Sequence, residues 1–142
     1  MLKIRHTGIY VNDLKSMKDF YCKNFGMKVA VHAFEKGNYI DTVLGLVNTR
    51  LELYKLKFED ETMLELIHRE EEEQTKIRGN VYDIGCIHLA ITVDDVEQTV
   101  KILQGSGVTF LSSPMLSDDG KAKVCVCREP EGNYVELVEE SA

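Results

Sequence analysis

The sequence predicts an α+β fold built from two similar modules, each with a strand, a helix and then further strands. Two observations predict it: an internal repeat, and the same order of strand and helix signals in both halves. Residues 6–21, HTGIYVNDLKSMKDFY, align with residues 88–103, HLAITVDDVEQTVKIL, and residues 63–67, MLELI, align with residues 134–138, YVELV. Two landmarks in the same order in each half indicate a duplicated module.

The first half begins with a strand signal followed by a helix signal. Residues 4–11 form a β-rich run that ends at Asn12-Asp13, a pair suited to the N-cap of a helix. Apolar residues then recur at helical spacing until Gly26, which predicts the end of the helix. The next segments predict a strand at residues 27–34, a strand or short helix at 39–46, and a hairpin of residues 50–58 and 63–68 around residues 59–61.

The second half repeats this order. Residues 84–93 predict a strand, and Asp94-Asp95 caps a helix that ends near Gly105 and Gly107. Residues 121–128 and 134–139 predict a hairpin through the sequence PEGN, in which proline fixes one turn dihedral and glycine or asparagine supplies a positive φ. We therefore expect modules at residues 1–69 and 83–142, joined by an acidic linker at 70–82 and forming one structural domain.

Composition restricts the partners of the chain. Its 142 residues carry 24 acidic and 17 basic side chains, so the net charge of −7 argues against nucleic acid as a partner. The sequence has no apolar run of about 20 residues that would span a membrane, and its start, MLKIRHTG, lacks the apolar core of a secretory signal. The four cysteines lack CxxC spacing and are expected to be reduced thiols. These features predict a cytoplasmic protein.

Two glutamates stand among apolar residues of the predicted strands. Because side chains alternate across a strand, Glu65 shares its face with Met63 and Ile67, and Glu136 occupies the equivalent place in the second half. An unpaired ionised carboxylate in such surroundings costs several kcal/mol. Each glutamate is therefore expected to be protonated, paired with a cation or exposed at a strand end.

Two histidines at repeat-related positions accompany these glutamates. His6 aligns with His88, and both lie in predicted strands, whereas His32 and His68 have no repeat mate. Two neutral imidazoles and two carboxylates neutralise a divalent ion and leave two coordination positions open, which suits Ni²⁺, Co²⁺, Mn²⁺, Fe²⁺ or an expanded Zn²⁺ better than a closed structural zinc site. The pattern predicts one divalent metal ion bound by His6, Glu65, His88 and Glu136.

The segments HTGIYVNDL, FYCKNFGMKV, MLELI, HLAITVDDVE and REPEGNYVELVEE resemble the glyoxalase/bleomycin resistance/dioxygenase (vicinal oxygen chelate) superfamily, and bacterial glyoxalase I in particular. The resemblance spans nearly the whole chain. It implies an α+β fold in which two paired βαβββ modules form a cupped mixed β-sheet with helices on the outside. It also implies that His6, Glu65, His88 and Glu136 follow the family's ligand order of His, Glu, His, Glu.

The activity implied by this resemblance is that of a metal-dependent isomerase or lyase, a lactoylglutathione lyase-like metalloenzyme. The metal would acidify the C–H of a hemithioacetal, and a carboxylate would carry the proton through an enediolate to give a thioester. Glu136 is the expected base and Glu65 its symmetric partner. The implied substrate is a thiol adduct of an α-oxoaldehyde such as methylglyoxal, or an acyl-CoA.

Two positions depart from the bacterial glyoxalase I pattern. Tyr10 replaces an arginine that helps to hold the glutathione carboxylates, and Arg69 replaces an asparagine. Both are candidate substrate-binding residues, and Arg69 is suited to an anionic group. The thiol carrier is therefore open.

Several alternatives and the assembly also stay open. A methylmalonyl-CoA epimerase-like enzyme would have glutamine at one glutamate ligand, and a fosfomycin-resistance enzyme would leave Glu65 unexplained. A metal-free, drug-sequestering member of the superfamily would have lost the ligand positions. The resemblance implies a homodimer, with the metal site either within one chain or shared between two.

Overall fold

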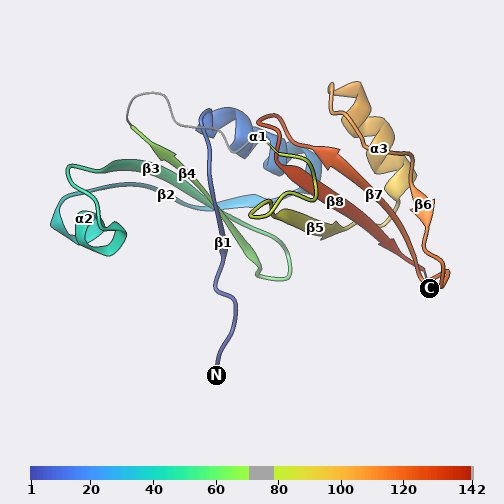
Figure 1. The fold of residues 1–142 in the computed structure, drawn as a ribbon, viewed down its shortest axis with the longest axis horizontal. Coiled ribbons are helices and arrows are strands. Elements are labelled where there is room, and N and C mark those ends of the chain that lie inside the picture. The colour runs from blue at the N-terminus through green and yellow to red at the C-terminus, as the bar shows by residue number, and fades with distance from the viewer. Residues whose placement is uncertain (71–78, 142) are drawn as a thin grey trace. The chain divides into compact units, whose positions relative to one another are not determined.

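A computed structural model of the chain describes residues 1–70 and 79–141 (Figure 1). The chain divides into two compact units, Met1–Thr75 and Lys76–Ala142. Most of the linker expected at residues 70–82 falls on residues 71–78, which lie outside the described residues. No helix in the described ranges is long and apolar enough to cross a membrane.

The first unit is a four-stranded mixed sheet with two helices. Its sheet has the order β1-β4-β3-β2, in which β1 pairs with β4 in parallel and the other pairs are antiparallel. The elements, in chain order, are β1 (Thr7–Tyr10), α1 (Leu14–Phe25), β2 (Lys28–Lys36), α2 (Asn38–Leu44), β3 (Arg50–Lys57) and β4 (Met63–Arg69).

The second unit repeats this topology. Its sheet has the order β5-β8-β7-β6, again with the first and last strands of the module parallel. The elements are β5 (His88–Thr92), α3 (Val96–Gly105), β6 (Met115–Leu116), β7 (Ala122–Arg128) and β8 (Tyr134–Glu140). The predicted α+β class with two βαβββ modules is confirmed, and α2 is an addition to the first module.

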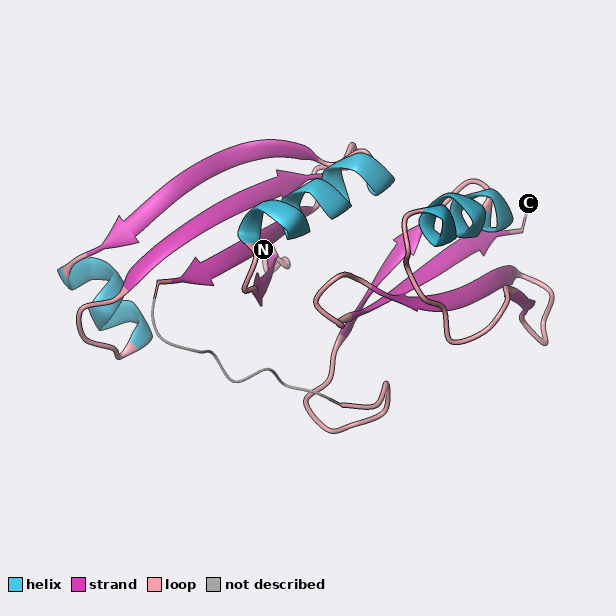
Figure 2. Ribbon diagram, turned by 90° about the horizontal axis from the view of Figure 1, so that it is seen from above, coloured by secondary structure: helices cyan, strands magenta, loops and turns pink. Residues whose placement is uncertain are grey.

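Each sheet is covered on one face by the long helix of its unit (Figure 2). In the first unit, α1 buries apolar residues at helical spacing, including Leu14, Met17 and Tyr21, and it packs on β3 and β4, where Leu56 and Leu66 are fully buried. Burial of these side chains removes apolar surface from water and holds helix and sheet together. We call the face turned away from α1 or α3 the second face.

The second unit uses the same packing. Here α3 buries Val96, Val100 and Leu103 and packs on β7 and β8. The helix-covered face of these strands carries four buried side chains: Cys125, Cys127, Val135 and Leu137. The two cysteines are therefore core residues, and burial raises the pKa of Cys127 to about 12.

Helix α2 packs on part of the second face of the first sheet. Ile40 forms a buried cluster with Leu51, Leu53 and Ile67, and the two leucines and Ile67 share the face that also carries Glu65. The predicted ambiguity at residues 39–46 is thus resolved as a helix, which ends at Gly45 with a φ of 66°.

The helix starts follow the sequence closely. Asp13 caps α1 by accepting a hydrogen bond from the Ser16 backbone N–H (2.9 Å), and Asp95 caps α3 by accepting one from Gln98 (2.8 Å). Gly26 ends α1 in the left-handed region, with a φ of 66°. The repeat in sequence is therefore also a repeat of capping geometry.

Two strand predictions had wrong bounds, and one strand was missed. The strands expected at residues 4–11 and 84–93 are shorter, and His6 lies just before β1 rather than within it. The reason is the same in both units: β1 begins where its parallel partner β4 provides Leu64 opposite Thr7, and β5 begins where β8 provides Tyr134 opposite His88. The two-residue strand β6 had no recognisable strand pattern and was missed.

The turn between β7 and β8 is held by a buried carboxylate. Glu129 is 2% exposed and accepts hydrogen bonds from the backbone N–H groups of Glu131 (2.8 Å) and Asn133 (2.5 Å). Burial raises the pKa of Glu129, while these hydrogen bonds act in the opposite direction. Gly132 has a φ of 94°, as the sequence of this turn predicts.

We expect Glu129→Ala to lower the free energy of unfolding by about 2–3 kcal/mol, because two backbone N–H groups lose their acceptor. Urea denaturation of the wild type and the variant measures this change. Asp118→Ala, which removes an exposed carboxylate from the turn between β6 and β7, is the matched control and should change the free energy by less than about 0.5 kcal/mol. Equal stability of the two variants would contradict this role of Glu129.

Candidate functional site

In the first unit the structure brings His6 and Glu65 together. His6 Nε2 lies 3.5 Å from Glu65 Oε2, and the side chains are 31% and 13% exposed. Glu65 lies in the middle of β4, whereas His6 lies just before β1. The parallel pairing of Gly8 with Glu65 places the start of β1 beside this carboxylate.

In the second unit the structure brings His88 and Glu136 together in the same way. His88 Nε2 lies 2.9 Å from Glu136 Oε2, and the side chains are 47% and 26% exposed. His88 is the first residue of β5, and Ala90, two residues on, pairs with Glu136 in β8. The two pairs therefore occupy equivalent places in the two modules.

Both pairs lie on the second face of their sheet. Leu64 and Leu66 are buried on the helix-covered face of β4, so Glu65 between them projects from the opposite face. Val135 and Leu137 place Glu136 in the same way on β8. The alternation predicted from the sequence is thus the feature that orients both carboxylates.

The donor atoms of each pair suit a divalent ion. Two donors that each lie about 2.1 Å from one ion, at right angles to each other, are about 3.0 Å apart, and the observed separations are 2.9 Å and 3.5 Å. Imidazole nitrogen and carboxylate oxygen are both ligands for zinc and for other transition metals. The residues present therefore fit a metal ion.

Each unit alone supplies two such donors. Within residues 1–70, and likewise within residues 79–141, no three His, Cys, Asp or Glu side chains are close enough together to hold one ion. The four-ligand set of His6, Glu65, His88 and Glu136 therefore stays a prediction.

Lys55 is a neighbour of Glu65 that sequence reasoning missed. It pairs directly with Glu65 across β3 and β4, and its Nζ lies 3.7 Å from Glu65 Oε2. The signal was present in the sequence, because a hairpin centred on Asp60 places residues 55 and 65 opposite each other. The first carboxylate therefore has two basic neighbours.

The two predicted substrate-binding residues share a face with Glu65. Tyr10 pairs with Ile67 and is half-exposed, and Arg69 lies four residues after Glu65 in the same strand. Gly8 lies between His6 and Tyr10 on this face, and a Cβ added to it would be in ordinary contact with Ile67 Cδ1 at 3.7 Å. The lack of a side chain at Gly8 leaves room beside Glu65.

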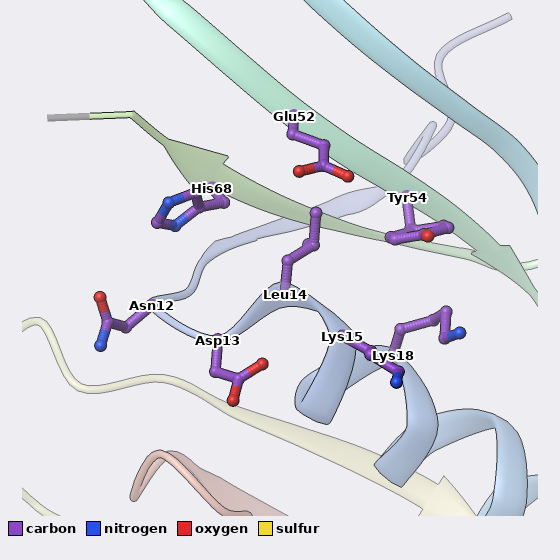
Figure 3. Close-up of a pocket in the computed structure, with 8 residues that line it drawn as sticks. All are labelled: Asn12, Asp13, Leu14, Lys15, Lys18, Glu52, Tyr54 and His68. Carbon is purple, nitrogen blue, oxygen red and sulfur yellow. The ribbon is translucent and has the colours of Figure 1, made fainter.

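A pocket of about 600 Å³ lies on the other, helix-covered side of the first sheet (Figure 3). It is lined by Asn12, Asp13, Leu14, Lys15, Lys18, Glu52, Tyr54 and His68. Several of its polar groups have structural partners: Glu52 Oε1 lies 2.8 Å from His32 Nε2, and His68 Nδ1 lies 3.1 Å from the Val11 carbonyl oxygen. We assign this pocket no chemistry, and none of the four candidate ligands lines it.

The chain belongs to the Glyoxalase/Bleomycin resistance protein/Dioxygenase superfamily, whose family model matches residues 3–137. This match confirms the resemblance seen in the sequence and agrees with the two βαβββ modules described above. Proteins that resemble this chain over nearly its whole length include lactoylglutathione lyases.

Lactoylglutathione lyase of Schizosaccharomyces pombe is 31% identical over 150 residues, an alignment that covers 98% of this chain and 48% of that protein. The chain thus spans about half the length of this relative. Lactoylglutathione lyase of Pseudomonas aeruginosa is 27% identical over 146 residues, which cover 96% of this chain and 81% of that protein.

Solved structures show the same fold. A glyoxalase family protein from Bacillus cereus superposes with a TM-score of 0.91 at 21% identity, covering 100% of this chain and 96% of that one. The trypanothione-dependent glyoxalase I of Leishmania major superposes with a TM-score of 0.70 at 26% identity, covering 99% of this chain and 88% of that one.

The space at Gly8 generates a test of the candidate site. Gly8→Ala should change the free energy of unfolding by less than about 1 kcal/mol and leave metal uptake intact, since its Cβ meets only an ordinary contact. Gly8→Leu places a bulky side chain beside Glu65 and should lower the affinity for Zn²⁺ by about tenfold or more. Titration calorimetry measures the Zn²⁺ affinity of both variants, and urea denaturation measures the free energy of unfolding of Gly8→Ala. Equal affinity of Gly8→Leu and wild type would mean that this face is not the metal site.

Proposed function

We propose that this chain is a metal-dependent enzyme of the glyoxalase I type, which converts a hemithioacetal into a thioester by moving a proton between neighbouring carbons. The observation that supports the proposal best is the equivalent placement of His6 with Glu65 and of His88 with Glu136 on the second face of each sheet. Packing alone has no reason to repeat such a pair in both modules. The names of the relatives, lactoylglutathione lyases, support the same reaction class.

These four side chains are the proposed ligands of one divalent ion, Ni²⁺, Co²⁺, Mn²⁺, Fe²⁺ or Zn²⁺. Such an ion, when bound, supplies Lewis-acid stabilisation of the negative charge that develops on the substrate oxygens. Two neutral imidazoles and two carboxylates balance its charge, so no further acidic ligand is needed.

Glu136 is the proposed base. Within the described residues Glu136 is paired with His88 alone, whereas Glu65 has both His6 and Lys55 beside it. Glu136 is also the more exposed of the two carboxylates, at 26% against 13%. A base must reach a C–H group of the substrate, and the more accessible carboxylate is better placed to do so. Glu136 would take the proton from one carbon and return it to the next.

The substrate is proposed to be the thiol adduct of an α-oxoaldehyde. Tyr10 and Arg69 share the face of Glu65, so an anionic part of the thiol carrier can contact Arg69 while the half-exposed Tyr10 ring lies alongside. The relatives differ in the thiol that their names carry, glutathione in one case and trypanothione in another. The thiol is therefore the variable to screen.

The test combines elemental analysis with turnover. Tag-free protein, stripped and then reconstituted with each of the five ions, should bind about one metal per chain. Methylglyoxal is then supplied with glutathione, trypanothione or coenzyme A, and thioester formation is followed. Glu136→Gln should lower turnover by about 10²–10⁴-fold, the range of a lost general base.

The matched control is Glu52→Gln, which also removes a carboxylate paired with a histidine but does so on the helix-covered face. It should keep both metal and turnover. If Glu136→Gln and Glu52→Gln behave alike, Glu136 is not the base. A protein that takes up no metal under any of these conditions would leave a cleft-binding member of the superfamily instead of an enzyme.

A further inference from the structure

Lys55 is a feature of the candidate site that breaks the repeat. Its Nζ lies 3.7 Å from Glu65 Oε2, the same oxygen that lies 3.5 Å from His6 Nε2. In the second module Val126 occupies the equivalent place, directly opposite Glu136. A fixed positive charge therefore accompanies one candidate carboxylate and is replaced by an apolar side chain at the other.

Partial burial strengthens the electrostatic interaction between Lys55 and Glu65. Glu65 is 13% exposed and Lys55 29% exposed, so the pair is only partly screened by water. Ile67, on the same face, is buried in the cluster with Leu51 and Leu53. An ammonium group in such a place attracts the carboxylate and repels any other cation that approaches it.

We propose that Lys55 is an internal competitor of the metal ion for Glu65. The inference rests on the proposed function, because it takes Glu65 as a metal ligand. When no metal is bound, the ammonium group holds and partly neutralises Glu65. Metal binding then requires the ammonium group to move away from this carboxylate or to remain beside a divalent ion. In both cases Lys55 lowers the affinity of the site for metal.

The experiment is titration calorimetry of the stripped full-length protein with Mn²⁺ and with Zn²⁺ at low ionic strength. Lys55→Met should bind both ions at least about tenfold more tightly than wild type, which corresponds to 1.4 kcal/mol at 25 °C. Lys55→Arg keeps the charge and should stay within about threefold of wild type. Raising the salt concentration should narrow the difference between Lys55→Met and wild type, since salt screens the repulsion.

Lys57→Met is the matched control. Lys57 lies two residues along β3 on the same face, opposite Met63, and it forms an ion pair with Glu61. Its substitution removes the same charge from the same strand without touching Glu65 and should leave the affinity within about threefold of wild type. Circular dichroism checks folding, and Lys55→Gln serves as a second uncharged variant if Lys55→Met does not fold.

The outcomes separate this inference from the proposed function. Equal or weaker metal binding by Lys55→Met, with wild type binding metal, would overturn the competition and leave the metal enzyme intact. Tighter binding by Lys55→Met and Lys57→Met alike would also overturn it, because the effect would then be one of general charge. Absence of binding by every protein would overturn the proposed function and this inference together. Binding by Lys55→Met but not by wild type would support the competition for Glu65 and overturn the metal enzyme proposed for the wild type.

Discussion

The packing of α1 onto the leucines of β4 determines the rest of the first unit. Leu64 and Leu66 must be buried, and side chains alternate along a strand, so the residue between them is forced onto the second face. That residue is Glu65. The same constraint acts in β8, where α3 covers Val135 and Leu137 and turns Glu136 away from the core. Burial of the neighbouring apolar side chains thus fixes the orientation of both carboxylates.

The two carboxylates differ in the charged groups that surround them. Glu65 is mostly shielded from water, and an ionised group in that situation needs favourable partners. The chain provides two basic side chains for Glu65 but only His88 for the more exposed Glu136 among the described residues. The two modules share one architecture but differ in the charge beside the equivalent carboxylates.

Sequence reasoning predicted most of the fold, whereas its four-ligand metal site stays a prediction. The caps at Asp13 and Asp95, the stop at Gly26 and the β7–β8 turn were predictable because they depend on local chemistry. The strand starts were not, because His6 and His88 stand where a parallel partner from far along the chain begins. Lys55 was missed although the register of the predicted hairpin places it opposite Glu65. An internal repeat points only to residues that recur, and Lys55 has no basic counterpart in the second module.

The parallel pairing of the first and last strands affects how each module folds. β1 and β4 are separated by all the other elements of their module, and so are β5 and β8. Such long-range pairing closes a large loop and tends to form late in folding. A histidine from the start of a module is therefore expected to meet its glutamate late in folding. A partly folded chain is therefore expected to lack the pair, so that any metal site built on it would assemble only together with the folded module.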